Sequence, residues 1–284
     1  MKIFQQLIDV WASRDVDQFT QLFSASSTWI VDGQPYEGRD AIAQYMRSLL
    51  ADVVQVRVVM RRSFSDLEDT HWCVAEWAFR TQRHDQAQTQ NACSEVEQAV
   101  LVHVREDDGK IDVMRTHNDS FRCCTTELNA PVRPEHRPAT YPTPARLMSK
   151  ADILALQHRH VMQGWRMGDA NQVCSCHAPD TVILNAWEVV QGHAEIRTSA
   201  AQYIANFADT HIEVHRIVYD GQNIAVNQTW SCTNRLTGKR AGDQDLIIGV
   251  VQDGQIHYWR EYFDPNQSAQ TLRQTHFGVR QAQI

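Results

Sequence analysis

The sequence lacks long apolar runs, glycine-rich loops and paired cysteine motifs. No stretch of its 284 residues approaches the roughly 20 apolar residues that span a bilayer, so we expect no membrane partner. Its seven cysteines form neither a C-x-x-C pair nor a zinc-finger spacing, which favours reduced thiols. A phosphate-binding loop, a dinucleotide fingerprint and a G-x-S-x-G motif are also missing, so any chemistry is expected to need no cofactor.

An excess of basic charge is absent as well. The chain has 27 Lys and Arg against 34 Asp and Glu, a net charge of −7 and a pI near 6.0. Phosphate binding needs a basic surface, so we expect no nucleic-acid partner. The first residues enter an amphipathic segment rather than the apolar core of a secretory signal, which favours a cytoplasmic protein.

Proline is concentrated in one stretch, where five of the eight prolines lie between residues 131 and 144. Proline has no amide donor and a fixed φ, so this stretch cannot join a sheet interior or a helix. It is typical of a semi-extended linker. We therefore predict a first domain over residues 1–128, a linker over 129–148, and a second domain with a C-terminal tail over 149–284.

The two predicted domains repeat one another. At an offset of 154, the residues Trp11, Asp15, Gly38 and Ile42 correspond to Trp165, Asp169, Gly192 and Ile196. At an offset of 145, the residues Gly109, Ile111, Arg115 and Asp119 correspond to Gly254, Ile256, Arg260 and Asp264. The first copy therefore contains nine extra residues, and we expect most of them in the polar run from Gln82 to Asn91, as a longer hairpin loop.

Both copies show the same pattern of expected elements. Apolar residues at i, i+3 and i+4 predict a first helix, over 4–23 and from 153 to 165, and a glycine precedes a second helix, over 40–50 and 194–207. Short strands are expected between them, at 28–31 and 181–184. Alternating strands follow and end in hairpins that turn at Asp-Gly. This order predicts an α+β fold in which helices cover a curled sheet and enclose a pocket.

The closing segment 253–264, D-G-Q-I-H-Y-W-R-E-Y-F-D, resembles the ending typical of SnoaL-like proteins in the nuclear transport factor 2-like superfamily. The resemblance covers about residues 4–122 and 153–265, and the first copy has drifted from the pattern over 108–119. It implies two cone-shaped nuclear transport factor 2-like (cystatin-like roll) domains, each a curled mixed or antiparallel sheet whose concave face is covered by helices. It also implies a mostly apolar pocket in which one or two carboxylates move protons.

The resemblance matches the catalytic acid of such cyclases to Glu261. Strand alternation places Glu261 on one face with Trp259 and Phe263, where desolvation would raise its pKa toward the range of a general base. If the faces are reversed, Glu261 instead pairs with an arginine on an exposed or interface strand. The same slot in the first copy holds Thr116, which cannot act as a base.

Other residues of the second copy are weaker candidates. Asp245, on the neighbouring strand, is either a second pocket acid or a solvated strand start. Tyr203 and His211 could donate hydrogen bonds to a substrate oxygen, although Tyr203 also fits a core position. The aromatic residues that suit a pocket wall are Trp165, Trp187, Trp230, Trp259 and Phe263.

In the first copy, the candidates for a residual pocket are Glu76, His103, Thr116 and His117, and each also fits a satisfied interior or rim position. The runs 158–160 and 174–177 contain histidine and cysteine, but neither has a second cluster at ligand spacing, so we expect no metal.

Two classes of function fit these features. The first is a cofactor-independent cyclase, isomerase or hydrolase acting on a hydrophobic carbonyl or polyketide-type substrate, with Glu261 as base. The second is a non-catalytic ligand-binding or assembly module. Because superfamily members often pair through the outer sheet face, the tandem could form an intramolecular pseudo-dimer, and a homodimer is compatible with this.

Overall fold

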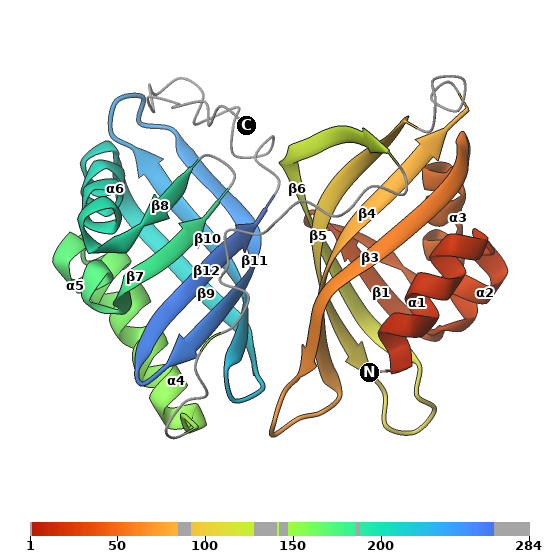
Figure 1. The fold of residues 1–284 in the computed structure, drawn as a ribbon, viewed down its shortest axis with the longest axis horizontal. Coiled ribbons are helices and arrows are strands. Elements are labelled where there is room, and N and C mark those ends of the chain that lie inside the picture. Colours follow the sequence, from red (N-terminus) through yellow and green to blue (C-terminus); the bar gives the residue numbers. More distant parts are fainter. Residues whose placement is uncertain (1, 85–91, 128–140, 142–146, 186–187, 264–284) are drawn as a thin grey trace. The chain divides into compact units, whose positions relative to one another are not determined.

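The computed structural model describes residues 2–84, 92–127, 141, 147–185 and 188–263 (Figure 1). The chain divides into two compact units, unit one (Met1–Pro134) and unit two (Glu135–Ile284), and each is described by itself. Most of the predicted linker, the loop over 85–91 and the C-terminal tail lie outside the described residues. Within the described ranges, no helix combines the length and apolar character needed to cross a membrane.

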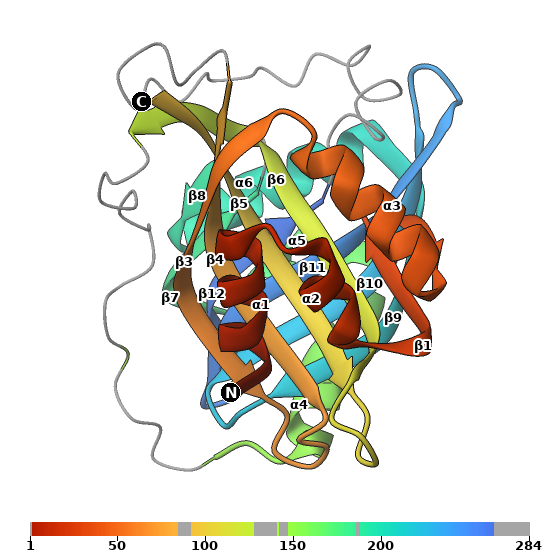
Figure 2. The same cartoon turned by 90° about the vertical axis from the view of Figure 1, so that its right-hand side faces the viewer.

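Unit one is a mixed sheet covered on one face by helices. Its elements are α1 (Lys2–Ser13), α2 (Val16–Gln21), β1 (Phe23–Val31), β2 (Gln34–Glu37), α3 (Gly38–Leu50), β3 (Val53–Ser65), β4 (Trp72–Arg83), β5 (Ala92–Val104) and β6 (Ile111–Glu127). The strand order is β2-β1-β6-β5-β4-β3, and β1 and β6 run parallel. Figure 2 shows α1, α2 and α3 lying across this sheet.

Unit two repeats the same topology. Its elements are α4 (Lys150–Gln157), the π-helix η2 (His158–Arg166), α5 (Ala170–Ser175), β7 (His177–Leu184), β8 (Val189–Gln191), α6 (Gly192–Asn206), β9 (Phe207–Tyr219), β10 (Asn223–Asn234), β11 (Arg240–Gln252) and β12 (Gln255–Tyr262). The strand order is β8-β7-β12-β11-β10-β9, with β7 parallel to β12. Figure 1 shows α5 and α6 on one side of this sheet. The predicted α+β fold is confirmed.

The repeated residues hold equivalent structural positions. Asp15 and Asp169 are N-caps whose carboxylates accept backbone N–H groups of α2 and α5. Gly38 and Gly192 begin α3 and α6 with φ of +77° and +76°, a region that strains any residue with a Cβ atom. Gly254, at φ +78°, forms the tight turn between β11 and β12. The repeat therefore preserves helix starts and turns.

The strand registers distribute the nine extra residues of unit one differently from the prediction. Thr116 pairs with Val100, which lies 16 positions earlier in the chain, whereas its counterpart Glu261 pairs with Ile247, only 14 positions earlier. The β5–β6 turn of unit one therefore contains two extra residues. The same comparison for the preceding pair of strands places four extra residues in the β4–β5 hairpin, and the remaining three lie before β4. The hairpin that contains Gln82 to Asn91 thus holds fewer than half of them, which corrects the expectation.

Aromatic rings fill the space between the helices and the sheet in unit one. Trp11 packs at 4.8 Å from Phe79 and at 6.1 Å from Trp29, measured between ring centroids. Phe19 packs at 5.3 Å from the same Trp29 ring. Ile183 is the counterpart of Trp29 in unit two. Trp29 on β1 pairs with a residue of β6, and Ile183 on β7 pairs with the equivalent residue of β12. This smaller side chain leaves room for a cavity in unit two.

The first helical segment of unit two contains a change that apolar spacing did not predict. After α4, which begins with a capping box of Ser149 and Asp152, the chain continues as the π-helix η2. A Cβ atom added to Gly164 would lie 2.7 Å from Val173 Cγ2 and 3.2 Å from its backbone nitrogen. Glycine at this position therefore allows η2 and α5 to approach closely.

We expect Gly164→Ala to destabilise unit two by about 1–3 kcal/mol, because the added methyl group overlaps Val173 in a packed interior. Urea unfolding of the full chain would measure the loss. The matched control is Gln163→Ala, an exposed neighbour on the same helix, which should stay within about 0.5 kcal/mol of the wild type. Equal stability of the two variants would contradict the close approach of η2 and α5.

Candidate active site

Unit two contains a cavity of about 140 Å³ between its helices and the inner face of its sheet. A cavity of similar size, about 150 Å³, holds a benzene molecule. Much of the wall is aromatic or aliphatic, and these lining residues include Trp165, Ile183, Val190, Ile196, Trp230, Trp259 and Phe263. The cavity therefore suits a ligand portion of about one apolar ring.

Glu261 projects from β12 into this cavity. Its Oε1 atom accepts a hydrogen bond from the indole Nε1 of Trp259 at 3.0 Å, two residues earlier on the same face. The Glu261 side chain is only partly buried and keeps some accessible surface at the cavity wall. Burial raises the pKa of Glu261 to about 7, and the nearby charge of Glu188 acts in the same direction.

Asp245 lines the same cavity from β11 and is almost completely buried. Its Oδ1 atom accepts from Trp230 Nε1 at 3.0 Å, and its Oδ2 atom from Gln228 Nε2 at 3.4 Å. Because Ile247 faces Glu261, Asp245 is a diagonal neighbour of Glu261 on the adjacent strand. Burial, followed by the charges of Glu261 and Asp243, raises the pKa of Asp245 well above its ordinary range.

The pKa values of both carboxyl groups are raised. Glu261 ionises at about pH 7, and burial, followed by the charges of Glu261 and Asp243, favours the protonated form of Asp245. A carboxylate can accept a proton, and a protonated carboxyl group can donate a hydrogen bond.

Residues of the helices form the other wall. Tyr203 on α6 places its ring 5.3 Å from Trp165, and its hydroxyl lies 3.3 Å from Thr210 Oγ1. Burial raises the pKa of Tyr203, so the phenol stays neutral. His160 on η2 is buried and also lines the cavity. Sequence reasoning had weighed the 158–160 run only as metal ligands and missed this role.

The structure places the predicted residues of the second copy as follows. The residues that line the cavity are Glu261, Asp245, Trp165, Tyr203, Trp230, Trp259 and Phe263. His211 is instead exposed on β9, since strand alternation turns its neighbours Thr210 and Ile212 to the cavity. Trp187 lies outside the described residues.

Unit one holds neutral side chains at both carboxyl positions. Thr116, the counterpart of Glu261, is buried, and its hydroxyl accepts from Trp29 Nε1 at 3.0 Å. The strand registers make Gln98 the counterpart of Asp245, and its amide oxygen accepts from Trp77 Nε1 at 2.7 Å. Neither side chain can act as a base.

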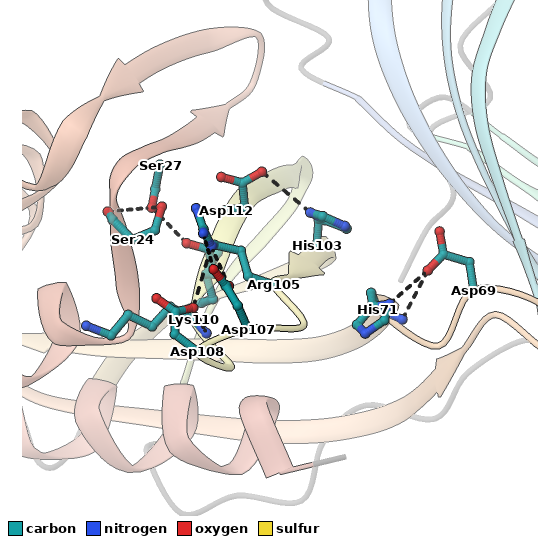
Figure 3. Close-up of polar contacts among 11 residues, drawn as sticks. Ser24, Ser27, Asp69, His71, His103, Arg105, Asp107, Asp108, Lys110 and Asp112 are labelled. Carbon is teal, nitrogen blue, oxygen red and sulfur yellow. Dashed lines mark hydrogen bonds and ion pairs between the residues drawn. The ribbon is translucent and has the colours of Figure 1, made fainter.

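The other unit-one candidates do not face the space between helices and sheet. Glu76 is fully buried and forms an ion pair with Arg62 at 2.6 Å, on the face of β4 opposite to the core residue Trp77. His117 follows Thr116 on β6, so its side chain lies on the opposite face of the strand, away from the helices. Figure 3 shows His103 directed toward Asp112, with 3.6 Å between Nδ1 and Oδ2. Glu76, His103 and His117 therefore fit the interior or rim positions that the sequence also allowed.

Two buried histidines lie together at the helix side of this region. His160 and His177 contact each other through their Nε2 atoms at 3.3 Å. In the part of the chain that the structure describes, no group of three or more His, Cys, Asp or Glu side chains could hold a metal ion.

Both units have the nuclear transport factor 2-like fold, and the chain belongs to the SnoaL-like family. Residues 4–114 and 158–265 each match the SnoaL-like domain. No curated protein matches this sequence.

Solved structures with this fold each match less than half of the chain. An LEH-like epoxide hydrolase of M. tuberculosis is 19% identical, with 44% of this chain and 91% of its own covered and a TM-score of 0.38. A ketosteroid isomerase-like protein of Catenulispora acidiphila, solved with trimethylamine, is 10% identical, with coverages of 43% and 92% and a TM-score of 0.38. AclR, a putative hydroxylase of Streptomyces galilaeus, is 19% identical, with coverages of 45% and 99% and a TM-score of 0.39.

The raised pKa of Glu261 predicts how stability depends on pH. Between about pH 4.5 and 7 the unfolded chain ionises this group while the folded unit keeps it protonated, so its contribution to stability falls as pH rises. Glu261→Gln removes that loss. Relative to the wild type, we expect the variant to gain about 2–3 kcal/mol of unfolding free energy between pH 5 and pH 8.

Urea unfolding of the full chain at the two pH values would measure this difference. Glu213→Gln is the control, because that exposed carboxylate on β9 should show no comparable change. A difference between wild type and Glu261→Gln that does not depend on pH would mean that the Glu261 carboxylate is solvated.

Proposed function

We propose that unit two is a cofactor-independent enzyme that moves a proton on a hydrophobic carbonyl compound, with Glu261 as the base. The observation that carries this proposal is the pair of carboxyl groups, Glu261 and Asp245, which line one largely apolar cavity and both have raised pKa values. The proposed reaction is acid–base chemistry of the kind that SnoaL-like cyclases and isomerases carry out.

In the proposed reaction, the Glu261 carboxylate removes a proton from the carbon next to the substrate carbonyl. The C–H electron pair moves into the carbonyl group and produces an enolate, whose oxygen accepts a hydrogen bond from the neutral Asp245 carboxyl group. Where a C=C bond of the substrate extends the enolate into a dienolate, return of the proton from Glu261 to its far carbon completes an isomerisation. Attack of the enolate carbon on a second carbonyl of the same molecule, with transfer of the Glu261 proton to the new alkoxide, completes a cyclisation.

Two tryptophans hold the reacting groups in place. The indole N–H of Trp259 binds one oxygen of Glu261 and leaves the other for the substrate proton. The indole N–H of Trp230 holds Asp245 on the neighbouring strand. Because both indoles also form part of the apolar wall, the residues that orient the acids also keep bulk water away.

The size of the cavity limits the substrate. A volume of about 140 Å³ surrounds roughly one six-membered ring, so a larger polyketide-type substrate would extend beyond the cavity. In unit one, the neutral Thr116 and Gln98 support a structural role rather than a second reaction. A purely ligand-binding role for unit two remains the competing function, and proton exchange separates it from catalysis.

We expect the wild-type chain to exchange the methyl protons of acetophenone, a single-ring ketone, for deuterium in D₂O. Proton NMR would follow the loss of the methyl signal. Glu261→Gln should reduce the catalysed exchange by at least about 100-fold, because it removes the base. Thr116→Ala, the matched change in unit one, should exchange like the wild type. Exchange that persists in Glu261→Gln would contradict the assigned base.

The exchange rate should also report the Glu261 pKa. Since only the carboxylate accepts a proton, the rate is expected to rise about tenfold per pH unit below pH 7 and to level off above it. NMR rates measured from pH 5 to pH 9 would give this profile. A plateau that begins near pH 4.5 would point to a carboxylate with an ordinary pKa.

A further inference from the structure

Glu188 lies where the cavity of unit two meets the solvent. It directly precedes β8, and its side chain is exposed although it forms part of the cavity wall. A residue that is open to solvent and also lines a cavity stands at the opening of that cavity. Much of the remaining wall is aromatic or aliphatic, whereas Glu188, Asn185 and Ser199 give the wall a polar side at this opening.

The residues around Glu188 hold its carboxylate in one place. The Ser199 hydroxyl, on α6, donates a hydrogen bond to Glu188 Oε1. The backbone N–H of Glu188 donates to Asn185 Oδ1 at 2.9 Å, and its backbone carbonyl accepts from the Asn185 N–H at 3.2 Å. A side chain that is already ordered loses less conformational entropy when it binds a ligand. Because Ser199 occupies Oε1 only, Oε2 of Glu188 can accept a hydrogen bond from a ligand.

No positive charge balances Glu188 in the cavity wall. In the part of the chain that the structure describes, neither lysine nor arginine lines the cavity, and no cationic side chain forms an ion pair with Glu188. His160, which also lines the cavity, stays neutral because burial lowers its pKa to about 4. The negative charge of Glu188 also contributes to the raised pKa of Glu261. The opening is therefore negative, and its potential reaches the proposed base.

We propose that Glu188 is a specificity-determining residue that binds a protonated amine of the ligand at the opening of the cavity. This inference rests on the proposed function, since it names the substrate class of the same cavity: a single-ring carbonyl compound that also carries an ammonium group. The ammonium N–H donates to the Glu188 carboxylate while the ring enters the apolar part of the cavity. Aromatic rings attract organic cations, so Trp165 and Tyr203 in the same wall favour the same ligand charge.

Two probes of the same shape test this charge selection. Benzylammonium and ethylbenzene differ only in an ammonium group against a methyl group, so the ratio of their affinities reports the effect of the charge. NMR titration of the full chain at pH 8 would give both dissociation constants. Glu188→Gln keeps an acceptor for Ser199 and removes the charge. We expect this variant to lower the ratio of benzylammonium to ethylbenzene affinity by about fivefold, the effect of losing a solvent-exposed ion pair.

Glu213→Gln is the matched control, because this exposed carboxylate on β9 does not line the cavity, and it should keep the wild-type ratio. A second measurement needs no variant. Raising the NaCl concentration from about 0.01 M to about 1 M shortens the screening length from about 30 Å to about 3 Å, which should lower the ratio in the wild type. A ratio that Glu188→Gln leaves unchanged, a ratio that does not respond to salt, or no binding of benzylammonium would each overturn the proposal.

The failure of this inference can be told apart from the failure of the proposed function. Deuterium exchange of acetophenone, which has no ammonium group, tests the base alone. Exchange that survives in Glu261→Gln would reject the base and leave the Glu188 contact standing. A wild-type affinity ratio in Glu188→Gln would reject the contact and leave the base standing. A larger fall of the ratio in Glu261→Gln than in Glu188→Gln would place the ammonium group beside the base and overturn the proposal.

Discussion

In both units, a tryptophan indole donates a hydrogen bond to the inward side chain of the last strand. The donor and the acceptor of this hydrogen bond differ between the two units. In unit one the donor is Trp29 on β1 and the acceptor is the neutral Thr116. In unit two the donor is Trp259 on β12 and the acceptor is Glu261. The same type of bond thus satisfies a hydroxyl in one unit and holds a carboxylate in the other.

The position of that tryptophan also decides whether a cavity exists beside it. Trp29 projects from β1 and packs with other rings between the helices and the sheet, whereas its counterpart Ile183 is smaller. Trp259 stands where unit one has Met114, and it forms part of a wall. In unit two the tryptophan is therefore on β12 instead of the neighbouring strand β7. This arrangement leaves space beside Glu261, whose carboxylate still accepts a hydrogen bond from the indole. Burial and hydrogen bonding then act on Glu261 in opposite directions, and burial has the larger effect on its pKa.

The same cavity joins local features that lie far apart in the chain. The π-helix η2 brings His160 under Trp165, and Gly164 lets that helix approach α5. The hairpin of β11 and β12 supplies the two acids from the opposite wall. The indole N–H groups of Trp165, Trp230 and Trp259 each donate to a polar side chain of this arrangement, so the tryptophans act both as donors and as apolar surface.

Much of the fold followed from local sequence patterns. The tandem repeat, the order of helices and strands, the N-caps Asp15 and Asp169 and the Asp-Gly turn all depend on residues close together in the chain, so they could be predicted. Strand alternation has a period of two, so it could group Glu261 with Trp259 and Phe263 on one face, but it left open whether that face points inward. The same rule could not place His211, because alternation does not tell which of the two faces of β9 turns toward the cavity.

Tertiary structure alone decided the chemistry of the cavity. The sequence offset of 145 does not reveal that Gln98 is the counterpart of Asp245, because the β5–β6 turn is two residues longer and only the strand registers show the match. The contact of His160 with Trp165 depends on a π-helix that apolar spacing cannot distinguish from an α-helix. The sequence by itself determined a duplicated fold and a carboxylate, Glu261, that shares one face of the last strand with two aromatic residues. The raised pKa of Glu261 arose from its burial and from the nearby charge of Glu188, because desolvation and charge act through space and not along the chain.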